Sequence, residues 1–315
     1  MKKILILGGG TAGTMMANKL FKALDREEWE ITIVDQHKTH YYQPGVLFIP
    51  FGIYNKADVV KPKGDFFPSG VKVIYQEIDR IEAKANQVHL AEGTVLKYDF
   101  LIIATGTQTR PDETPGLLGP EWRKSIFDFY TIEGAVALQQ FFRSWEGGKL
   151  VLCISELPFK CPVAPIEFVS LAEAYFTEKG IRDKVDITYV TPLAGAFTKP
   201  IATKMLSQLL DEKNIKVIPD FYLESVDNEK KVLKSYDEQE IPFDALTIVP
   251  MNMGSEMIER SGLGDDMNYV ETDKETLQSK KFENIFVLGD AANIPTSKAG
   301  SVAHFAAEIL FENMM

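Results

Sequence analysis

The segment Gly8-Gly9-Gly10-Thr11-Ala12-Gly13 has the residue types and spacing of a loop that binds phosphate groups. It follows four apolar residues, and apolar residues then recur at helical spacing, which predicts a strand, a tight turn and a helix. Gly8 would permit the turn, Gly10 would let a pyrophosphate approach the backbone, and Gly13 would let the helix pack on the strand. The free N–H groups of the helix N-terminus would then bind the phosphates.

An acidic residue stands where such a site requires one. Asp35 follows the apolar run of the next predicted strand, 22 residues after Gly13. At the end of that strand a carboxylate can accept hydrogen bonds from both hydroxyls of a ribose. Strand, glycine loop, helix, second strand and terminal acid therefore occur in the order that a dinucleotide-binding domain needs.

The chain contains an internal repeat, which organises the rest of the prediction. Residues 72–104 and 216–249 both open with Lys-Val-Ile and both close with an aromatic residue and Asp before an apolar run, at an offset of 144 or 145 residues. Lys3–Ile6 similarly matches Lys149–Leu152. We expect an α/β fold with two Rossmann-like dinucleotide-binding domains, one of residues 1–110 plus 251–315 and a second of residues 111–250. Residues 284–288 should complete the first sheet, with no counterpart in the second half.

The second half lacks the features that would bind a nucleotide. Its turn, residues 153–162, contains no glycine, but it has two prolines and Glu156, which would repel a phosphate. Thr191 stands where Asp35 stands in the first half. Reduction by NAD(P)H in the usual way is therefore not expected, and a small donor should supply the electrons.

Two further turns favour FAD as the cofactor of the first half. Ala104-Thr105-Gly106 follows one apolar strand, and Gly289-Asp290 follows another. The sequence thus resembles the flavoproteins with two dinucleotide-binding domains, the glutathione-reductase-like fold, in which such turns complete the flavin site. An extended FAD needs a second point of attachment, and Asp290 could accept a ribityl hydroxyl; a cap of the local turn is the alternative role.

The second turn carries a more specific signature. Cys161-Pro162-Val163-Ala164-Pro165-Ile166-Glu167 resembles the C-x-x-A-P-x-E motif of sulfide:quinone oxidoreductases and of the flavoprotein subunit of flavocytochrome c sulfide dehydrogenase. His40–Gly45 resembles the Tyr-Gln-Pro segment that lies along the flavin in that family, and Ser297–Gly300 falls where the family has Lys-Thr-Gly. The resemblance covers essentially the whole chain. It implies further cofactor-binding residues at Gln36, Tyr42, Gln43, Pro44, Ile78, Lys298, Ala299 and Gly300.

The same resemblance assigns catalytic roles to Cys161, Glu167 and Lys298. In the family a cysteine takes sulfur from the substrate and passes electrons to the flavin, which suits a thiolate nucleophile. Glu167 would carry protons that sulfide loses, and Lys298 would place positive charge near the flavin's pyrimidine end. Each residue also has an alternative role. Cys161 could be an inert buried thiol, Glu167 a charge that stabilises a helix N-terminus, and Lys298 a solvated lysine.

Three departures from the family limit what the resemblance implies. The family's second sulfur-relay cysteine and its apolar C-terminal capping and membrane segment lie downstream of the last helix, in a region that this chain does not contain. Cys153 could replace that cysteine, but its place in an apolar strand favours core packing. No cysteine occurs in the segments that attach flavin covalently in some members, so FAD should be non-covalent. Residues 46–51 could face a quinone, although a buried core run is the alternative.

Composition excludes several functions. A formal net charge of −11 argues against nucleic acid and against a polybasic membrane anchor. We find no signal-peptide core and no uncharged span of membrane length, and two cysteines make no disulfide scaffold. The four histidines show no ligand spacing, so no metal is expected. These features predict a cytoplasmic protein. They leave open whether it binds peripherally to the inner face of the membrane, through a segment not in this chain, and whether it forms a homo-oligomer.

The sequence therefore predicts an FAD-dependent oxidoreductase that oxidises sulfide or a related sulfur donor through Cys161. The acceptor would be a quinone or a protein. Two alternatives remain at this point: a type II NADH dehydrogenase-like flavin reductase, and a non-catalytic or partner-dependent flavoprotein that carries sulfur.

Overall fold

The structure is a computed structural model that describes all residues, 1–315. The chain divides into two compact units: residues 1–41, 60–108 and 253–315 form the first, and residues 42–59 and 109–252 form the second. The sequence-based boundaries assigned residues 42–59 to the first domain, whereas the structure groups them with the second unit. The chain passes between the units after residues 41, 59, 108 and 252. The last two passages lie in β10 (Thr107–Thr109) and β19 (Asn252–Gly254), which pair with each other.

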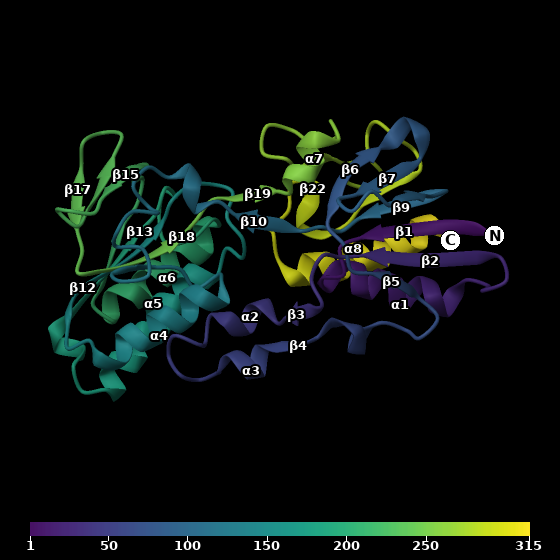
Figure 1. Cartoon of the computed structure of the whole chain (residues 1–315). Coiled ribbons are helices and arrows are strands. Elements are labelled where there is room, and N and C mark those ends of the chain that lie inside the picture. The colour runs from purple at the N-terminus through teal and green to yellow at the C-terminus, as the bar shows by residue number, and fades with distance from the viewer. The chain divides into compact units, whose positions relative to one another are not determined.

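The first unit is built on a five-stranded parallel sheet in the order β21-β9-β1-β2-β5 (Figure 1). Its strands are β1 (Lys2–Leu7), β2 (Trp29–Val34), β5 (Lys72–Ile74), β9 (Phe100–Ile103) and β21 (Ile285–Val287). They are almost wholly apolar because a parallel sheet is covered on both faces. The strand predicted at residues 284–288 does complete this sheet.

Side chains alternate between the two faces of the first sheet and so separate two cores. Ile4 and Ile6 point to the face covered by α1 (Thr11–Ala23) and α8 (Gly300–Met314), and Leu5 and Leu7 point to the other face. That second face is covered by an antiparallel meander and a short helix: β6 (Ile78–Glu82), β7 (Gln87–Leu90), β8 (Val95–Lys97) and α7 (Glu256–Arg260). The smaller paired strands of this unit are β3 (Thr39–Tyr41) with β4 (Val60–Pro62) and β20 (Val270–Glu271) with β22 (Ala292–Asn293).

The second unit repeats this plan with a parallel sheet in the order β11-β18-β12-β13-β14. Figure 1 labels β12, β13 and β18 of this sheet. Its strands are β11 (Ile126–Phe127), β12 (Gly148–Ile154), β13 (Val185–Val190), β14 (Ile215–Ile218) and β18 (Ala245–Val249). The internal repeat is thus confirmed, but one expectation was wrong. The strand β21 does have a counterpart, because β11 occupies the equivalent edge position beside β18.

The two faces of the second sheet are covered as in the first unit. One face packs against α4 (Ile132–Ser144), α5 (Ala164–Glu178) and α6 (Pro200–Glu212), together with the short segment that carries α2 (Gln43–Val46) and α3 (Lys56–Val59). Leu47 and Phe51 of that segment are buried in the same apolar cluster, so residues 46–51 serve as core. The other face packs against the meander of β15 (Leu223–Asp227), β16 (Val232–Ser235) and β17 (Glu240–Pro242). None of the helices is both long enough and apolar enough to span a bilayer.

Candidate functional site

The glycine turn of the first unit shows a separate reason for each glycine. Gly8 has a φ of +97°, and a Cβ there would lie 2.4 Å from the Ala104 carbonyl oxygen. A Cβ at Gly13 would lie 1.9 Å from the Gly8 carbonyl oxygen. A Cβ at Gly10, in contrast, would meet no atom within 4 Å. The first and third glycines are therefore required by the fold, whereas Gly10 faces open space at the start of α1, as a site for a pyrophosphate requires.

The other two turns predicted to bind cofactor meet the glycine turn at the carboxyl ends of β1, β9 and β21. Gly8 packs against Ala104, and Gly289, with a φ of +75°, packs against Ala12 at the start of α1. The Thr105 Oγ1 is buried there without a hydrogen-bond partner in the protein. Because leaving a buried hydroxyl unpaired costs about 1–3 kcal/mol, this atom fits a site that a ligand completes.

Asp35 directly follows β2, in the predicted place, and is almost fully buried. Its Oδ2 accepts hydrogen bonds from the Gly9 N–H at 2.7 Å and from the Lys63 ammonium at 2.6 Å, and its Oδ1 accepts from the His37 N–H at 2.7 Å. The carboxylate is thus oriented by three donors. Lys63 is a neighbour that the sequence analysis did not identify, because nothing in the linear pattern separates it from Lys61.

Lys298 is held by the protein, although the sequence left a solvated lysine as an alternative. Its ammonium donates to the Ala292 carbonyl oxygen at 2.6 Å and lies 4.0 Å from the centre of the Tyr269 ring. Burial lowers the pKa of Lys298, and the charges of Asp290 and Asp265 oppose that effect. Lys298 and Asp290 therefore belong to one charged cluster, just before α8 begins at Gly300. The Tyr269 ring, which was not predicted from the sequence, packs against the Lys298 ammonium of this cluster.

The remaining candidates of the first unit are placed less distinctively. Gln36 is exposed, and Ile78 is half-buried at the start of β6, where it packs against the meander core. Ala299 precedes the first residue of α8. The exposed His304 lies on that helix, and no group of side chains in the chain could hold a metal ion.

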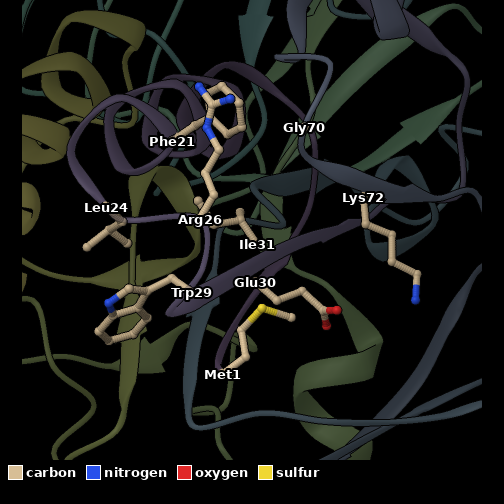
Figure 2. Close-up of a pocket in the computed structure, with 9 residues that line it drawn as sticks. All are labelled: Met1, Phe21, Leu24, Arg26, Trp29, Glu30, Ile31, Gly70 and Lys72. Atoms are coloured by element: carbon tan, nitrogen blue, oxygen red, sulfur yellow. The ribbon is translucent and has the colours of Figure 1, made fainter.

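A separate pocket of about 260 Å³ lies at the other end of the first sheet (Figure 2). Met1, Trp29 and Lys72, which line it, stand at the amino ends of β1, β2 and β5. Figure 2 shows the Arg26 side chain over the Phe21 ring. The Arg26 Cζ lies 4.3 Å from the centre of that ring. The glycine turn lies at the carboxyl ends of the same strands, so this pocket is no part of the nucleotide site.

In the second unit the corresponding turn is nine residues long and carries Cys161. It runs from the end of β12 at Ile154 to the start of α5 at Ala164. Cys161 has a φ of +58°, a left-handed conformation that costs a residue other than glycine about 1–2 kcal/mol. Pro165 lies in the first turn of α5, where a proline needs no N–H partner. The loop that leads into this helix carries two further prolines, Pro158 and Pro162.

The Cys161 thiol is partly buried, and burial raises its pKa. Hydrogen bonding from the backbone N–H groups of Ala164 and Val163 acts in the opposite direction, whereas the charge of Glu167 raises the pKa further. Glu167 is exposed in the first turn of α5. Cys161 and Glu167 therefore interact electrostatically, and the Glu167 carboxylate is in contact with solvent.

A hydrogen-bonded chain supports the Cys161 loop from beneath. The Tyr130 hydroxyl donates to the Lys160 carbonyl oxygen at 2.6 Å, and the Gln43 amide donates to the Tyr130 carbonyl oxygen at 2.9 Å. Gln43, predicted to bind cofactor, is thus connected to the loop that holds Cys161. Tyr42 is exposed beside it, as is Pro44. Tyr130 is a supporting residue that the sequence analysis missed.

Cys153 does not partner Cys161. On β12, Leu152 and Ile154 belong to the core of the helical face, against which Cys161 packs, whereas Cys153 belongs to the core of the meander face. The sheet therefore separates the two sulfur atoms. Cys153 is fully buried, and burial raises its pKa. The prediction that it packs in the core is confirmed.

Fold and site together define a class. Two Rossmann-like units, a glycine turn with its terminal acid, and two supporting turns make this chain an FAD-dependent oxidoreductase with two dinucleotide-binding domains. Residues 2–144 match the family of pyridine nucleotide-disulphide oxidoreductases.

Within this class the chain is similar to the sulfide:quinone oxidoreductases. It is 28% identical to the mitochondrial sulfide:quinone oxidoreductase of Mus musculus, across 99% of this chain and 70% of that protein. The solved structure of the sulfide:quinone oxidoreductase from Aquifex aeolicus superimposes with a TM-score of 0.86 at 21% identity, covering 100% of this chain and 76% of that one. The type II NADH:quinone oxidoreductase of Staphylococcus haemolyticus is 27% identical, across 94% of this chain and 76% of that protein.

Proposed function

We propose that the protein oxidises sulfide or a related sulfur donor at Cys161 and passes the electrons through FAD to a quinone. The observation that carries this proposal is the turn before α5. Where a nucleotide-binding unit has glycines, this turn holds Cys161 in a left-handed conformation, partly buried and near enough to the exposed Glu167 for that charge to act on its pKa. The relatives named as sulfide:quinone oxidoreductases support the choice of donor and acceptor.

The sulfur step can be written in balanced form. The Cys161 thiol and one H₂S give a Cys161 persulfide, two protons and two electrons, as one S–S bond forms and two S–H bonds break. The thiolate is the reactive form of cysteine, so the N–H groups of Ala164 and Val163 would assist the step by stabilising it. Glu167, exposed beside the sulfur, would carry protons to solvent.

FAD, when bound, would supply the site that takes up the two electrons and passes them on to the acceptor. Gly10 and the start of α1 would hold its pyrophosphate, Asp35 its adenosine ribose, and Thr105 and Asp290 its ribityl chain. Lys298 would place positive charge where reduction adds negative charge. We propose that FAD is bound without a covalent link, since neither cysteine of the chain lies in this unit.

The quinone sets where the protein works. Because quinones dissolve in lipid, we propose a cytoplasmic protein that works at the inner face of the membrane. A protein acceptor would not require this location.

The test is an anaerobic absorbance titration of the purified holoprotein, with sulfide in one cuvette and NADH in another. We expect sulfide to bleach the flavin band and NADH to leave it unchanged, because the second unit lacks a glycine turn and a terminal acid. The Cys161→Ala variant should retain FAD but lose the bleaching by sulfide. Bleached protein should recover its colour when a soluble quinone is added.

Three results would contradict the proposal in different ways. Rapid bleaching by NADH would favour a type II NADH dehydrogenase-like reductase. Bleaching of Cys161→Ala by sulfide would remove the cysteine from the mechanism. A Cys161 persulfide that forms from an added polysulfide, by transfer of a sulfane sulfur and without any bleaching, would indicate a sulfur carrier when detected by mass spectrometry.

A further inference from the structure

Lys63 carries a buried charge that has no role in the proposed reaction. It follows β4 directly, and only 5% of its surface is exposed. Lysine is almost never buried to this extent unless its ammonium is paired. Here the partner is Asp35, the acid of the dinucleotide site, at 2.6 Å.

The backbone fixes Lys63 beside the glycine turn. Its N–H donates to the Lys38 carbonyl oxygen at 2.8 Å, and the strand before it pairs with β3. A Cβ at Gly9 would lie 3.2 Å from the Lys63 Cδ and 2.8 Å from the Phe67 Cζ. The Lys63 stem and the Phe67 ring therefore close the turn over Gly9, while Gly10 beside it stays open.

Hydrogen-bond capacity shows that Asp35 alone cannot bind both hydroxyls of a ribose. An ionised carboxylate offers about four acceptor positions. Gly9 and Lys63 occupy the two on Oδ2, and His37 occupies one on Oδ1. Only one acceptor position remains, which is too few for the two ribose hydroxyls that the sequence led us to expect at Asp35.

The ammonium of Lys63 has the complementary capacity. It carries three N–H donors, of which one bonds Asp35. Its charge also acts on its surroundings, since burial and Lys63 together lower the pKa of the neighbouring His40. A positive donor with two further N–H groups is thus fixed on Oδ2 of Asp35, the carboxylate whose other oxygen keeps one acceptor position.

We infer that Lys63 is a cofactor-binding residue that recognises the adenosine ribose of FAD jointly with Asp35. Asp35 Oδ1 accepts from one ribose hydroxyl, and the Lys63 ammonium donates to the oxygen of the other. The inference rests on the proposed binding of FAD at the Gly8–Gly13 turn, and it is independent of the sulfur chemistry.

The first test compares the rate at which FAD leaves the Lys63→Met holoprotein with the wild-type rate, followed by the rise of flavin fluorescence on dilution. We expect dissociation to accelerate by about 10- to 100-fold, the usual effect of losing a hydrogen bond to a charged group. Lys63→Arg should be intermediate. Lys213→Met is the matched control, because it removes a 2.6 Å ion pair with Glu173 in the second unit and should leave FAD release unchanged.

A second comparison separates direct binding from a role in which Lys63 only orients Asp35. In an Asp35→Asn background, an orienting lysine has no carboxylate left to hold, so Lys63→Met would add no further effect. A lysine that contacts the ribose should still slow FAD release, and its loss should accelerate release by about fivefold or more. This comparison also applies if Lys63→Met alone fails to fold, because the double variant buries no unpaired carboxylate.

The readouts distinguish this inference from the proposed function. The control variant Lys213→Met should keep both the wild-type rate of FAD release and the wild-type reduction by sulfide, measured per bound flavin. Wild-type FAD release in Lys63→Met, or no added effect in the Asp35→Asn background, would overturn the inference. Failure of sulfide to bleach the wild-type protein would overturn the proposed function and leave the FAD-release result standing.

Discussion

The turns that follow β1 and β12 occupy equivalent positions in the two sheets, but their residues support different chemistry. The turn between β1 and α1 has three residues, all glycine, whereas the turn between β12 and α5 has nine and no glycine. The residues that follow β2 and β13 are equally placed, since the Asp35 N–H donates to Ile74 and the Thr191 N–H donates to Ile218, both at 3.0 Å. In the first unit the charged Asp35 lies there and accepts a hydrogen bond from the glycine turn, whereas in the second unit a neutral Thr191 is buried there. The sheet thus supplies the position, and the turn decides what can bind.

The largest expected effect tests the open space at Gly10. Gly10→Val should reduce the affinity for FAD by at least about 100-fold, because its side chain would occupy the approach to the pyrophosphate. The apoprotein should fold normally, since nothing lies within 4 Å of a Cβ there. Fluorescence titration with FAD and thermal unfolding measure the two effects.

Gly13→Ala provides the contrast within the same turn. Its Cβ would collide with the Gly8 carbonyl oxygen, so the melting temperature of the apoprotein should fall as well. A Gly10→Val protein that purifies with normal FAD content would contradict the distinction between the two glycines.

The second turn should be recognised by its pH dependence. Burial and Glu167 raise the pKa of Cys161 above the ordinary value, so the thiol is mostly protonated at pH 7. The thiolate fraction, and with it the rate of alkylation by iodoacetamide, should rise by about tenfold per pH unit from pH 7 and still be rising at pH 9. Peptide mass spectrometry would assign the label to Cys161. A plateau below pH 8 would contradict the raised pKa.

The support beneath the second turn should have a smaller effect. Tyr130→Phe removes the hydrogen bond to the Lys160 carbonyl and so loosens the peptide group that enters Cys161. Because such a bond contributes about 1 kcal/mol, the rate of flavin reduction by sulfide should fall by about fivefold while FAD content is kept. Tyr175→Phe, in the same core cluster, is the control that should leave the rate unchanged. Equal rates in the two variants would show that Tyr130 does not position Cys161.

The smallest effect concerns the charge of Glu167. Since this charge raises the pKa of Cys161, Glu167→Gln should lower that pKa and increase the alkylation rate at pH 8 by about two- to threefold. Glu178→Gln, at the exposed far end of α5, should have no effect. A slower rate in Glu167→Gln would reverse the assigned sign.

The parts of the site that follow local pattern were predictable from sequence. The glycine turn, Asp35, the Ala104 and Gly289 turns and the core position of Cys153 all depend on strand and turn residues close in the chain. Lys63 and Tyr130 were not found, because their roles depend on Asp35 and Lys160, 28 and 30 residues away. The edge strand β11 was missed for a related reason, since two residues, Ile126 and Phe127, carry no periodic signal.

Because the second sheet separates the two sulfur atoms, the number of reactive thiols reports whether the second unit is folded. Cys161 is partly exposed on one side, and Cys153 is sealed in the opposite core. Native protein should therefore react with one equivalent of a thiol reagent, and unfolded protein with two. Counting equivalents along a denaturant series would follow the loss of that core in the second unit, without any added probe.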